Sequence, residues 1–279
     1  LKKHVTEIEE QINKDTIAAE DAAIEARANR LFTQAFSEKD PLKAIELYSQ
    51  VIELKPDFFE AYNNRGNQQK KIKEYDKAMR DYDKAIELAP NVAILYVNRG
   101  GLKDDLEDKN GAMMDYDKAI ELDANYAMAY YNRGNLKDDL GEKEEALKDY
   151  DKAIQIDHNF IAAHNNRGNV KDDLGDKEGA LKDYEKIIEL EPNNSVALNN
   201  IACVYMKLGE LNKALDSVND ALVIDSNNFA FWETKGEICM KLDDYDGAEF
   251  AFTKAIALNP KDKESLRNRA KCYRKLAES

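Results

Sequence analysis

Small residues recur along this chain at intervals of 34 residues, and that period restricts the possible fold more than any other feature. One set of positions is filled by glycine or alanine, namely Gly66, Gly100, Gly134, Gly168, Ala202, Gly236 and Ala270. A second set at the same interval is Ala44, Ala78, Ala112, Ala146, Ala180, Ala214 and Ala248. Two antiparallel helices can cross closely only where their facing side chains are small. The two sets therefore predict one helix crossing in each unit.

A third set of positions, at the same interval, carries large side chains: Tyr48, Tyr82, Tyr116, Tyr150, Tyr184, Val218 and Phe252. Each lies four residues after an alanine of the second set, on the same helical face. We expect these side chains to fill the space between the second helix of one unit and the first helix of the next. The predicted units are 25–58, 59–92, 93–126, 127–160, 161–194, 195–228 and 229–262.

The two ends of such an array need covering, because each unit buries its apolar face only against its neighbours. We expect residues 263–279 to form a capping helix whose inner face holds Leu266, Ala270 and Tyr273. Residues 1–24 also have helical spacing, with apolar side chains at Val5, Ile8, Ile12 and Ala19. This N-terminal helix either caps the first unit or forms a short coiled-coil arm.

The 34-residue period with small residues at fixed offsets resembles the tetratricopeptide repeat (TPR) family, in its N-R-G subclass. The resemblance implies an all-α fold, a right-handed superhelical solenoid of antiparallel helix pairs. Most of the family has a large apolar residue before the glycine, where this chain has Arg65, Arg99, Arg133 and Arg167. Lysine stands three residues after the glycine, at Lys103, Lys137 and Lys171. A half-buried arginine needs a partner, and Asp81, Asp115, Asp149 and Asp183 recur at a suitable place, so we interpret the Arg–Asp pairs as structural.

In the TPR family, the first helices of successive units line a concave groove, so the resemblance implies which side chains face a ligand. The sixth position of five consecutive units is asparagine, at Asn64, Asn98, Asn132, Asn166 and Asn200. The ninth position adds Asn67, Asn135 and Asn169. Asparagine disfavours the interior of a helix, but its amide can both donate to and accept from a peptide backbone. The pattern is similar to the asparagine ladder of the O-GlcNAc transferase superhelix. The alternative is that recent duplication copied the asparagines.

Positions 12 and 13 of the units predict the charge of the groove. They hold Asp104-Asp105, Asp138-Asp139 and Asp172-Asp173 in the middle of the chain, and Lys70-Lys71, Met206-Lys207 and Met240-Lys241 toward its ends. Of each acidic pair, we expect Asp105, Asp139 and Asp173 to face the groove and to attract a ligand that is basic near its centre. The alternative is that one carboxylate of each pair neutralises a lysine or arginine of the scaffold. Met206 and Met240 are expected to provide an adaptable apolar surface.

A carboxylate clamp for the C-terminal tails of Hsp70 and Hsp90 is excluded by the same positional comparison. In the family, that clamp needs lysine at positions 5 and 2 of particular units. Position 5 holds Asn63, Val97, Tyr131, Asn165, Asn199 or Glu233, and position 2 holds Glu60, Ile94, Met128, Ala162, Val196 or Ala230. None of these residues is a lysine.

The formal net charge of −14 argues against nucleic acid or an anionic membrane as the main partner, because both require a basic surface. No apolar run is long enough to span a membrane. The three cysteines, Cys203, Cys239 and Cys272, form no CxxC motif, which favours the cytoplasm or another reducing compartment. The chain begins with Leu1 rather than methionine, so an organellar or exported location stays open.

No catalytic or metal-binding motif accompanies the repeats. The only histidines are His4, His158 and His164, and none belongs to a known ligand pattern. We therefore expect no catalytic residue, no cofactor and no metal, and His164 is expected to be a packing residue. The sequence predicts a non-catalytic scaffold or adaptor that binds an extended polar or basic peptide segment in its groove. The alternatives are a homo-oligomerising assembly module and the substrate-recognition part of a larger enzyme.

Overall fold

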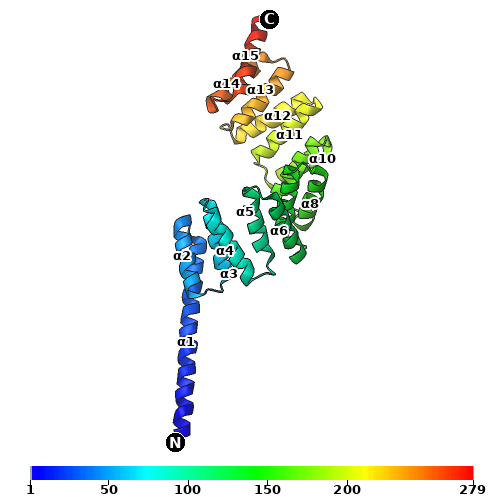
Figure 1. The fold of residues 1–279 in the computed structure, drawn as a ribbon. Coiled ribbons are helices and arrows are strands. Elements are labelled where there is room, and N and C mark those ends of the chain that lie inside the picture. Colours follow the sequence, from blue (N-terminus) through cyan, green and yellow to red (C-terminus); the bar gives the residue numbers. More distant parts are fainter. Residues whose placement is uncertain (1, 279) are drawn as a thin grey trace. The chain divides into compact units, whose positions relative to one another are not determined.

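A computed structural model describes the backbone of residues 2–278 and the side chains of residue 4 and residues 11–278. Within that range, every regular element is an α-helix (Figure 1). The chain divides into two compact units, residues 1–136 and 137–279, which are called the first unit and the second unit below. Elsewhere, a unit such as 93–126 is one 34-residue repeat. The first contains α1 (Lys2–Ser37), α2 (Pro41–Leu54), α3 (Phe59–Lys71), α4 (Tyr75–Leu88), α5 (Ala93–Asp105), α6 (Lys109–Leu122) and most of α7 (Ala127–Asp139). The second contains α8 (Lys143–Ile156), α9 (Ile161–Asp173), α10 (Lys177–Leu190), α11 (Ser195–Leu208), α12 (Leu211–Ile224), α13 (Phe229–Lys241), α14 (Tyr245–Leu258) and α15 (Lys263–Glu278).

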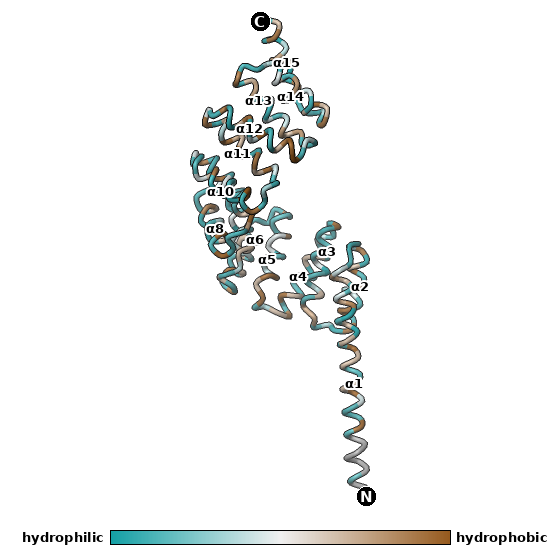
Figure 2. Tube along the Cα trace, turned by 180° about the vertical axis from the view of Figure 1, so that it is seen from behind, coloured by the Kyte–Doolittle hydropathy of each residue, from teal (hydrophilic) through white to brown (hydrophobic). Residues whose placement is uncertain are grey.

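Consecutive helices pack as pairs, which confirms the predicted all-α repeat fold. α3 packs on α4, α5 on α6, α9 on α10, α11 on α12, and α13 on α14. Neighbouring pairs within each compact unit also pack on one another, as α4 does on α5 and α10 on α11. Hydrophobic and hydrophilic residues alternate over short stretches along the paired helices, which is the pattern of helices with one buried face (Figure 2).

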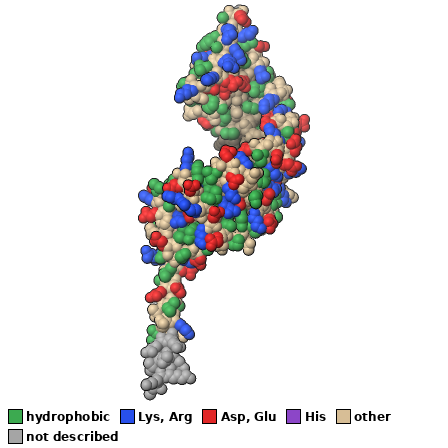
Figure 3. Space-filling model, viewed as in Figure 1, with side chains coloured by type: hydrophobic (Ala, Val, Ile, Leu, Met, Phe, Trp, Pro, Cys, Tyr) green, Lys and Arg blue, Asp and Glu red, His purple; other side chains and the backbone are tan. Residues whose placement is uncertain are grey.

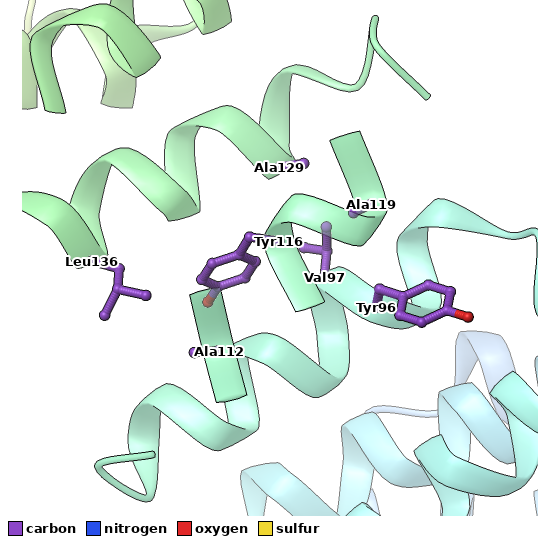
Figure 4. Close-up of a cluster of buried hydrophobic side chains, with 7 residues drawn as sticks. All are labelled: Tyr96, Val97, Ala112, Tyr116, Ala119, Ala129 and Leu136. Atoms are coloured by element: carbon purple, nitrogen blue, oxygen red, sulfur yellow. The ribbon is translucent and has the colours of Figure 1, made fainter. Parts of the chain in front are cut away.

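The first and third sets of repeated positions meet inside each pair. A Cβ atom added to Gly66, Gly100 or Gly168 would lie 2.8 Å from the tyrosine ring sixteen residues later in the chain. Glycine is favoured there because a methyl group would force the ring or the first helix to shift. The ring also reaches the next unit, as we expected: Tyr116 packs with Val97 of its own pair and with Leu136 of α7 (Figure 4).

Aspartate side chains cap the starts of several second helices, and glycines follow the ends of first helices. Asp108, Asp176 and Asp244 each accept a hydrogen bond of 2.9 Å from the backbone N–H three residues later, which caps α6, α10 and α14. Gly175 and Gly209 follow the first helix of their pairs with φ of 90° and 78°, in the left-handed region that glycine adopts without strain.

The N-terminal segment continues directly into the first packed helix, because α1 runs without a break from Lys2 to Ser37. The side chains of residues 11–27 are all exposed, and burial begins at Ala28. Within the first unit, this segment therefore has the geometry of an arm rather than of a cap (Figure 1). The side chains of Val5 and Ile8, which we also expected on its apolar face, lie outside the described residues.

The C-terminal helix α15 packs on α14, but our prediction of its inner face was wrong. The buried side chains are Ser265, Asn268 and Cys272, whereas Leu266 and Tyr273 are 39% and 52% exposed. Ala270 is exposed too. Its counterparts in complete units face the second helix of their own pair, and the described residues contain no such helix beside α15. The face that packs on the preceding pair is therefore the buried one.

Candidate peptide-binding groove

A hollow of about 600 Å³ opens in the first unit beside several of the predicted groove residues. Its lining comes from α1, α2, α3 and α5 and consists of Phe36, Tyr48, Asn64, Asn67, Gln68, Lys70, Lys71, Asn98 and Asp105. Four residues of our predicted groove thus lie together. Of the other predicted asparagines in this unit, Asn132 and Asn135 are half-buried on α7. Asn166, Asn169 and Asn200 belong to α9 and α11 of the second unit.

The asparagines at position 6 connect neighbouring first helices. The amide of Asn98 on α5 donates to Oδ1 of Asn63 on α3 over 2.8 Å. The amide of Asn63 donates in turn to Oδ1 of Asn64 over 3.2 Å. In the second unit, Asn200 donates to Asn165 over 3.1 Å and Asn165 to Asn166 over 3.2 Å. These amides therefore hold successive units in register, a structural role that our sequence analysis missed because the partner lies one repeat away.

Asn67 and Asn169, two of the asparagines at position 9, have a different partner, the hydroxyl group of a core tyrosine. Tyr82 donates to Oδ1 of Asn67, and Tyr184 donates to Oδ1 of Asn169, both over 2.7 Å. Burial raises the pKa of each of these tyrosines, so both hydroxyls stay protonated donors. The interaction fixes the amide orientation, with the oxygen toward the tyrosine and the NH₂ group available to the solvent side.

Most carboxylates of the predicted acidic centre form ion pairs with lysines of neighbouring elements. In the first unit, Asp105 lies 3.0 Å from Nζ of Lys70, and Asp104 lies 2.7 Å from Nζ of Lys109. In the second unit, Asp173 pairs with Lys143, while Asp172 pairs with both Lys177 and Lys207. Burial alone would raise the pKa of Asp172, but the two lysines lower it. Charges of both signs are accordingly interspersed over the visible surface (Figure 3).

A concentration of negative charge nevertheless remains at one place in the second unit. The pKa of Asp138 is raised, first by partial burial and then by repulsion from Asp173 and Asp139, although Lys143 acts in the opposite direction. Asp139 and Asp173 thus lie close enough to Asp138 to repel its charge, with Lys143 beside it. A cationic group arriving here would relieve the repulsion.

The two methionines are placed in separate surroundings. Met206 packs with the cluster that holds Ala202, Val218 and Phe231. Met240 lies beside Cys239 and Cys272 and lines a hollow of about 320 Å³ between α13, α14 and α15. Their expected role as apolar contacts for a ligand stays a prediction.

The repeated arginines and aspartates form the structural pairs that we predicted. Nε and Nη2 of Arg65 each donate over 2.7 Å to the carboxylate of Asp81, and Arg99 binds Asp115 with bonds of 2.9 and 2.7 Å. Such two-bond contacts are the strongest arginine–carboxylate geometry. Sequence reasoning missed the lysine that joins them: Lys103 lies 2.8 Å from Asp115. It also missed a link between units, in which Nη1 of Arg99 donates to Asp83 over 2.7 Å.

Groups that could perform chemistry are held in structural contacts. His164 is 5% exposed and bonds to Asp183 over 3.1 Å, in keeping with a packing role. Burial raises the pKa of all three cysteine thiols, that of Cys239 to about 11, which suppresses the reactive thiolate. Among the described residues, no cluster of three or more histidine, cysteine or carboxylate side chains has the geometry to hold a metal ion. In the same part of the chain, no helix combines the length and the apolar character needed to cross a membrane.

Comparisons with solved structures find the same repeat architecture elsewhere. A structure of YrrB, described as "a TPR protein with an unusual peptide-binding site", is 25% identical, with a TM-score of 0.57 over 68% of this chain and 97% of that one. A structure of MamA is 27% identical, with a TM-score of 0.53 over 58% of this chain and 94% of that one. PilF of Pseudomonas aeruginosa, at 20% identity and a TM-score of 0.67 over 76% of this chain and 97% of that one, shares the fold.

Comparison with curated protein sequences found no match. Models of the tetratricopeptide repeat match residues 59–92, 93–126, 127–160, 161–194, 183–216 and 229–262. Together these matches cover more than half of the chain. The all-helical pairs, the glycine–tyrosine packing inside them and these matches agree that the chain belongs to the tetratricopeptide repeat family.

Proposed function

We propose that this protein is an interaction scaffold that binds an extended polar segment of another protein along its first helices. The observation that carries the proposal is the hollow of about 600 Å³ lined by Asn64, Asn67, Gln68 and Asn98. The peptide-binding site described for YrrB and the TPR fold of this chain support a role in protein interaction.

The amides in this hollow suit a peptide backbone. Asn98 uses one N–H for Asn63, which leaves its Oδ1 and a second N–H for a ligand. Asn67 uses its Oδ1 for Tyr82, which leaves its NH₂ group. An extended segment presents alternating C=O and N–H groups whatever its side chains are, so fixed amides can bind it with little dependence on sequence. Because Asn63 and Tyr82 orient the amides beforehand, binding costs less conformational entropy.

The carboxylates of the second unit add a preference for charge to this proposal. Asp138, Asp139 and Asp173 would attract a lysine or arginine of a ligand, and the raised pKa of Asp138 reports their local repulsion. At the first unit, Lys70 is paired with Asp105, whereas Lys71 is bonded only to the neutral Gln68. We therefore expect the second unit to favour a basic residue of a ligand, and the surface around α3 in the first unit to favour neutral or acidic ones.

A display library of unstructured peptides with blocked ends tests the proposal. Peptides enriched on the intact protein should lose at least about tenfold in affinity for the double variant Asn64→Ala, Gln68→Ala, because two hydrogen bonds are removed at about 1 kcal/mol each. The matched control is Gln155→Ala, which removes an exposed amide from the second helix of a pair. Equal affinity for the double variant, measured by fluorescence anisotropy and with unchanged helicity, would overturn the proposal. Replacement of a lysine in the enriched peptides by glutamine should weaken binding to the intact protein more than to Asp138→Asn.

Self-association is the second candidate, because the arm exposes apolar side chains. Ile12, Ile17 and Ile24 are 60%, 51% and 41% exposed on α1. Exposed isoleucines on one helix favour pairing with a second copy. Sedimentation velocity should show dimers that Ile12→Glu, Ile17→Glu abolishes. A monomer at every concentration of the intact protein would exclude this role.

A further inference from the structure

A second hollow of about 310 Å³ lies between α2, α3 and α4 in the first unit. It is lined by Ile45, Ser49, Arg65, Gln69, Glu74, Lys77, Arg80 and Asp81, and it shares none of these residues with the groove hollow. The corresponding place in later 34-residue repeats is occupied by charged side chains of the protein itself. A comparison between units therefore shows what is missing here.

In the unit 93–126, the place is filled by an aspartate and a lysine. Nη1 of Arg99 donates to Asp83 of the preceding unit over 2.7 Å, and Nζ of Lys103 lies 2.8 Å from Asp115. The unit 161–194 repeats the arrangement, with Asp151 2.7 Å from Arg167 and Lys171 2.8 Å from Asp183. In both units, the arginine thus has two carboxylate partners and the buried aspartate has two cationic partners.

In the unit 59–92, both of these charged groups are replaced by neutral ones. Ser49 stands where the later units have the aspartate, so Nη1 of Arg65 donates to a hydroxyl group at 3.0 Å. Gln69 stands where they have the lysine, and Asp81 is left with Arg65 as its ion-pair partner. Gln69 is only 5% exposed, and its buried Oε1 has no hydrogen-bond partner. Buried polar atoms in folded proteins nearly always have a partner, so this oxygen calls for a donor from outside the chain.

The charges around the hollow favour a carboxylate together with that donor. Arg65 pairs with Asp81, and Lys77 pairs with Glu74 over 2.8 Å. Arg80 also lines the hollow and forms no ion pair within the described residues. The lining therefore carries one positive charge in excess. Ser49 and Gln69 both line this hollow, so the carboxylate and the N–H donor that later repeats have at their places would lie in the same small volume.

We propose that this hollow binds a compact group that carries a carboxylate next to an N–H donor, as an α-amino acid does. The carboxylate takes the place of the missing aspartate, between Arg65 and Arg80. The nitrogen takes the place of the missing lysine ammonium and donates to Oε1 of Gln69 and to Asp81. A volume of about 310 Å³ is at the lower end of small-molecule sites and fits one amino acid. A free amino acid and the last residue of a peptide chain offer the same chemistry.

Titration of the intact protein with four probes tests this inference, using the side-chain amide signal of Gln69 in NMR spectra. Glycine carries both groups, N-acetylglycine mimics a chain end, acetate carries only the carboxylate, and methylamine carries only the ammonium. Glycine or N-acetylglycine should bind with saturation and shift the Gln69 signal, while acetate and methylamine bind at least tenfold more weakly. Tighter binding of glycine identifies a free amino acid as the source, and tighter binding of N-acetylglycine identifies a chain end.

Two variants copy residues that the chain already uses at the matching places, so both are compatible with the fold. Gln69→Lys and Ser49→Asp should each weaken binding of the better probe at least tenfold, because each supplies from within the charge that the ligand would bring. The matched control Ser37→Asp adds the same charge on α1, outside the hollow, and should leave binding unchanged. The inference is overturned if neither probe saturates, if methylamine binds as well as glycine, or if both variants bind the probe like the intact protein. None of these results depends on the groove.

Discussion

Two adjacent helix pairs of the second unit, α9–α10 and α11–α12, differ in what fills the matching space between their helices. The filling is charged in α9–α10 and mainly apolar in α11–α12. In α9–α10, the space holds the charged residues Arg167, Lys171 and Asp183, with bonds from both cations and from His164 to the one carboxylate. In α11–α12, the same positions hold Ile201, Tyr205 and Ser217. The ring–glycine contact differs as well: Tyr184 lies on Gly168, whereas Val218 packs with Ala202.

The comparison teaches that the helix crossing does not require charge. Small residues and a complementary side chain fix the approach of the two helices in both pairs, and either filling completes it. The charged and the apolar fillings differ in what happens when one side chain is removed. An apolar filling loses contact area when one member is removed, whereas an ion network that loses one member leaves the others buried without a partner.

Removal of Asp183 should have the largest effect. Asp183→Ala leaves Arg167, Lys171 and His164 half-buried or buried without their shared acceptor, and we expect a loss of about 3–5 kcal/mol in unfolding free energy. Urea denaturation, combined with amide hydrogen exchange of α9 and α10, measures it. Ser217→Ala, at the matching place, should change stability by less than about 0.5 kcal/mol. If the triple exchange Arg167→Ile, Lys171→Tyr, Asp183→Ser is no more stable than Asp183→Ala, the two fillings are not equivalent.

Acid should weaken α9–α10 selectively. Burial alone would raise the pKa of Asp183, but bonds from His164, Arg167 and Lys171 lower it to about 2. A lowered pKa in the folded state stabilises the fold above the unfolded pKa of about 4, and this contribution of about 2 kcal/mol is lost as the pH falls from 4 to 2. Hydrogen exchange of α9–α10 should therefore accelerate over that pH interval relative to α11–α12. The difference should disappear in Asp183→Asn, and its persistence there would assign it to another group.

The glycine contact should be exchangeable between the two pairs. A methyl group in Gly168→Ala would lie 2.8 Å from the Tyr184 ring, so we expect a loss of about 1–2 kcal/mol despite the better helix propensity of alanine. Gly168→Ala combined with Tyr184→Val reproduces the Ala202–Val218 pair and should lose less than the sum of the two single changes. A double-mutant cycle measures this coupling, and strict additivity would show that the ring and the glycine are independent.

Removal of the ion pair between neighbouring repeats should have the smallest effect on stability. Asp151 pairs with Nη1 of Arg167 over 2.7 Å, but the Asp151 side chain is 62% exposed. Exposed ion pairs contribute little, so Asp151→Ala should cost less than about 1 kcal/mol, and high salt should reduce that cost further. An effect as large as that of Asp183→Ala would mean that Arg167 depends on both carboxylates equally.

Period and residue size were sufficient to predict the helix pairs, because they follow from a steric rule that acts within one unit. The Arg–Asp pairs could be predicted for the same reason, since Arg65 and Asp81 belong to one pair. The partners of polar groups that bond from one repeat to the next could not. Asn98 bonds to Asn63 and Lys70 to Asp105 only because of the offset between neighbouring pairs, which no local pattern specifies. The face of α15 was wrong because Ala270 has the residue type of a crossing position without the second helix that makes one.

The hydroxyl groups of two core tyrosines have a consequence for how such arrays change. Tyr82 and Tyr184 bury their rings in the core, yet their oxygens orient Asn67 and Asn169 on the first helices. Where the ring position holds Val218 or Phe252, position 9 holds Cys203 or Glu237 instead. Loss of one oxygen atom, as in Tyr184→Phe, would release the neighbouring amide to turn over and offer its carbonyl to a ligand while the packing stays the same. A change of one buried atom can thus alter the hydrogen-bonding groups that the first helices expose, one repeat at a time.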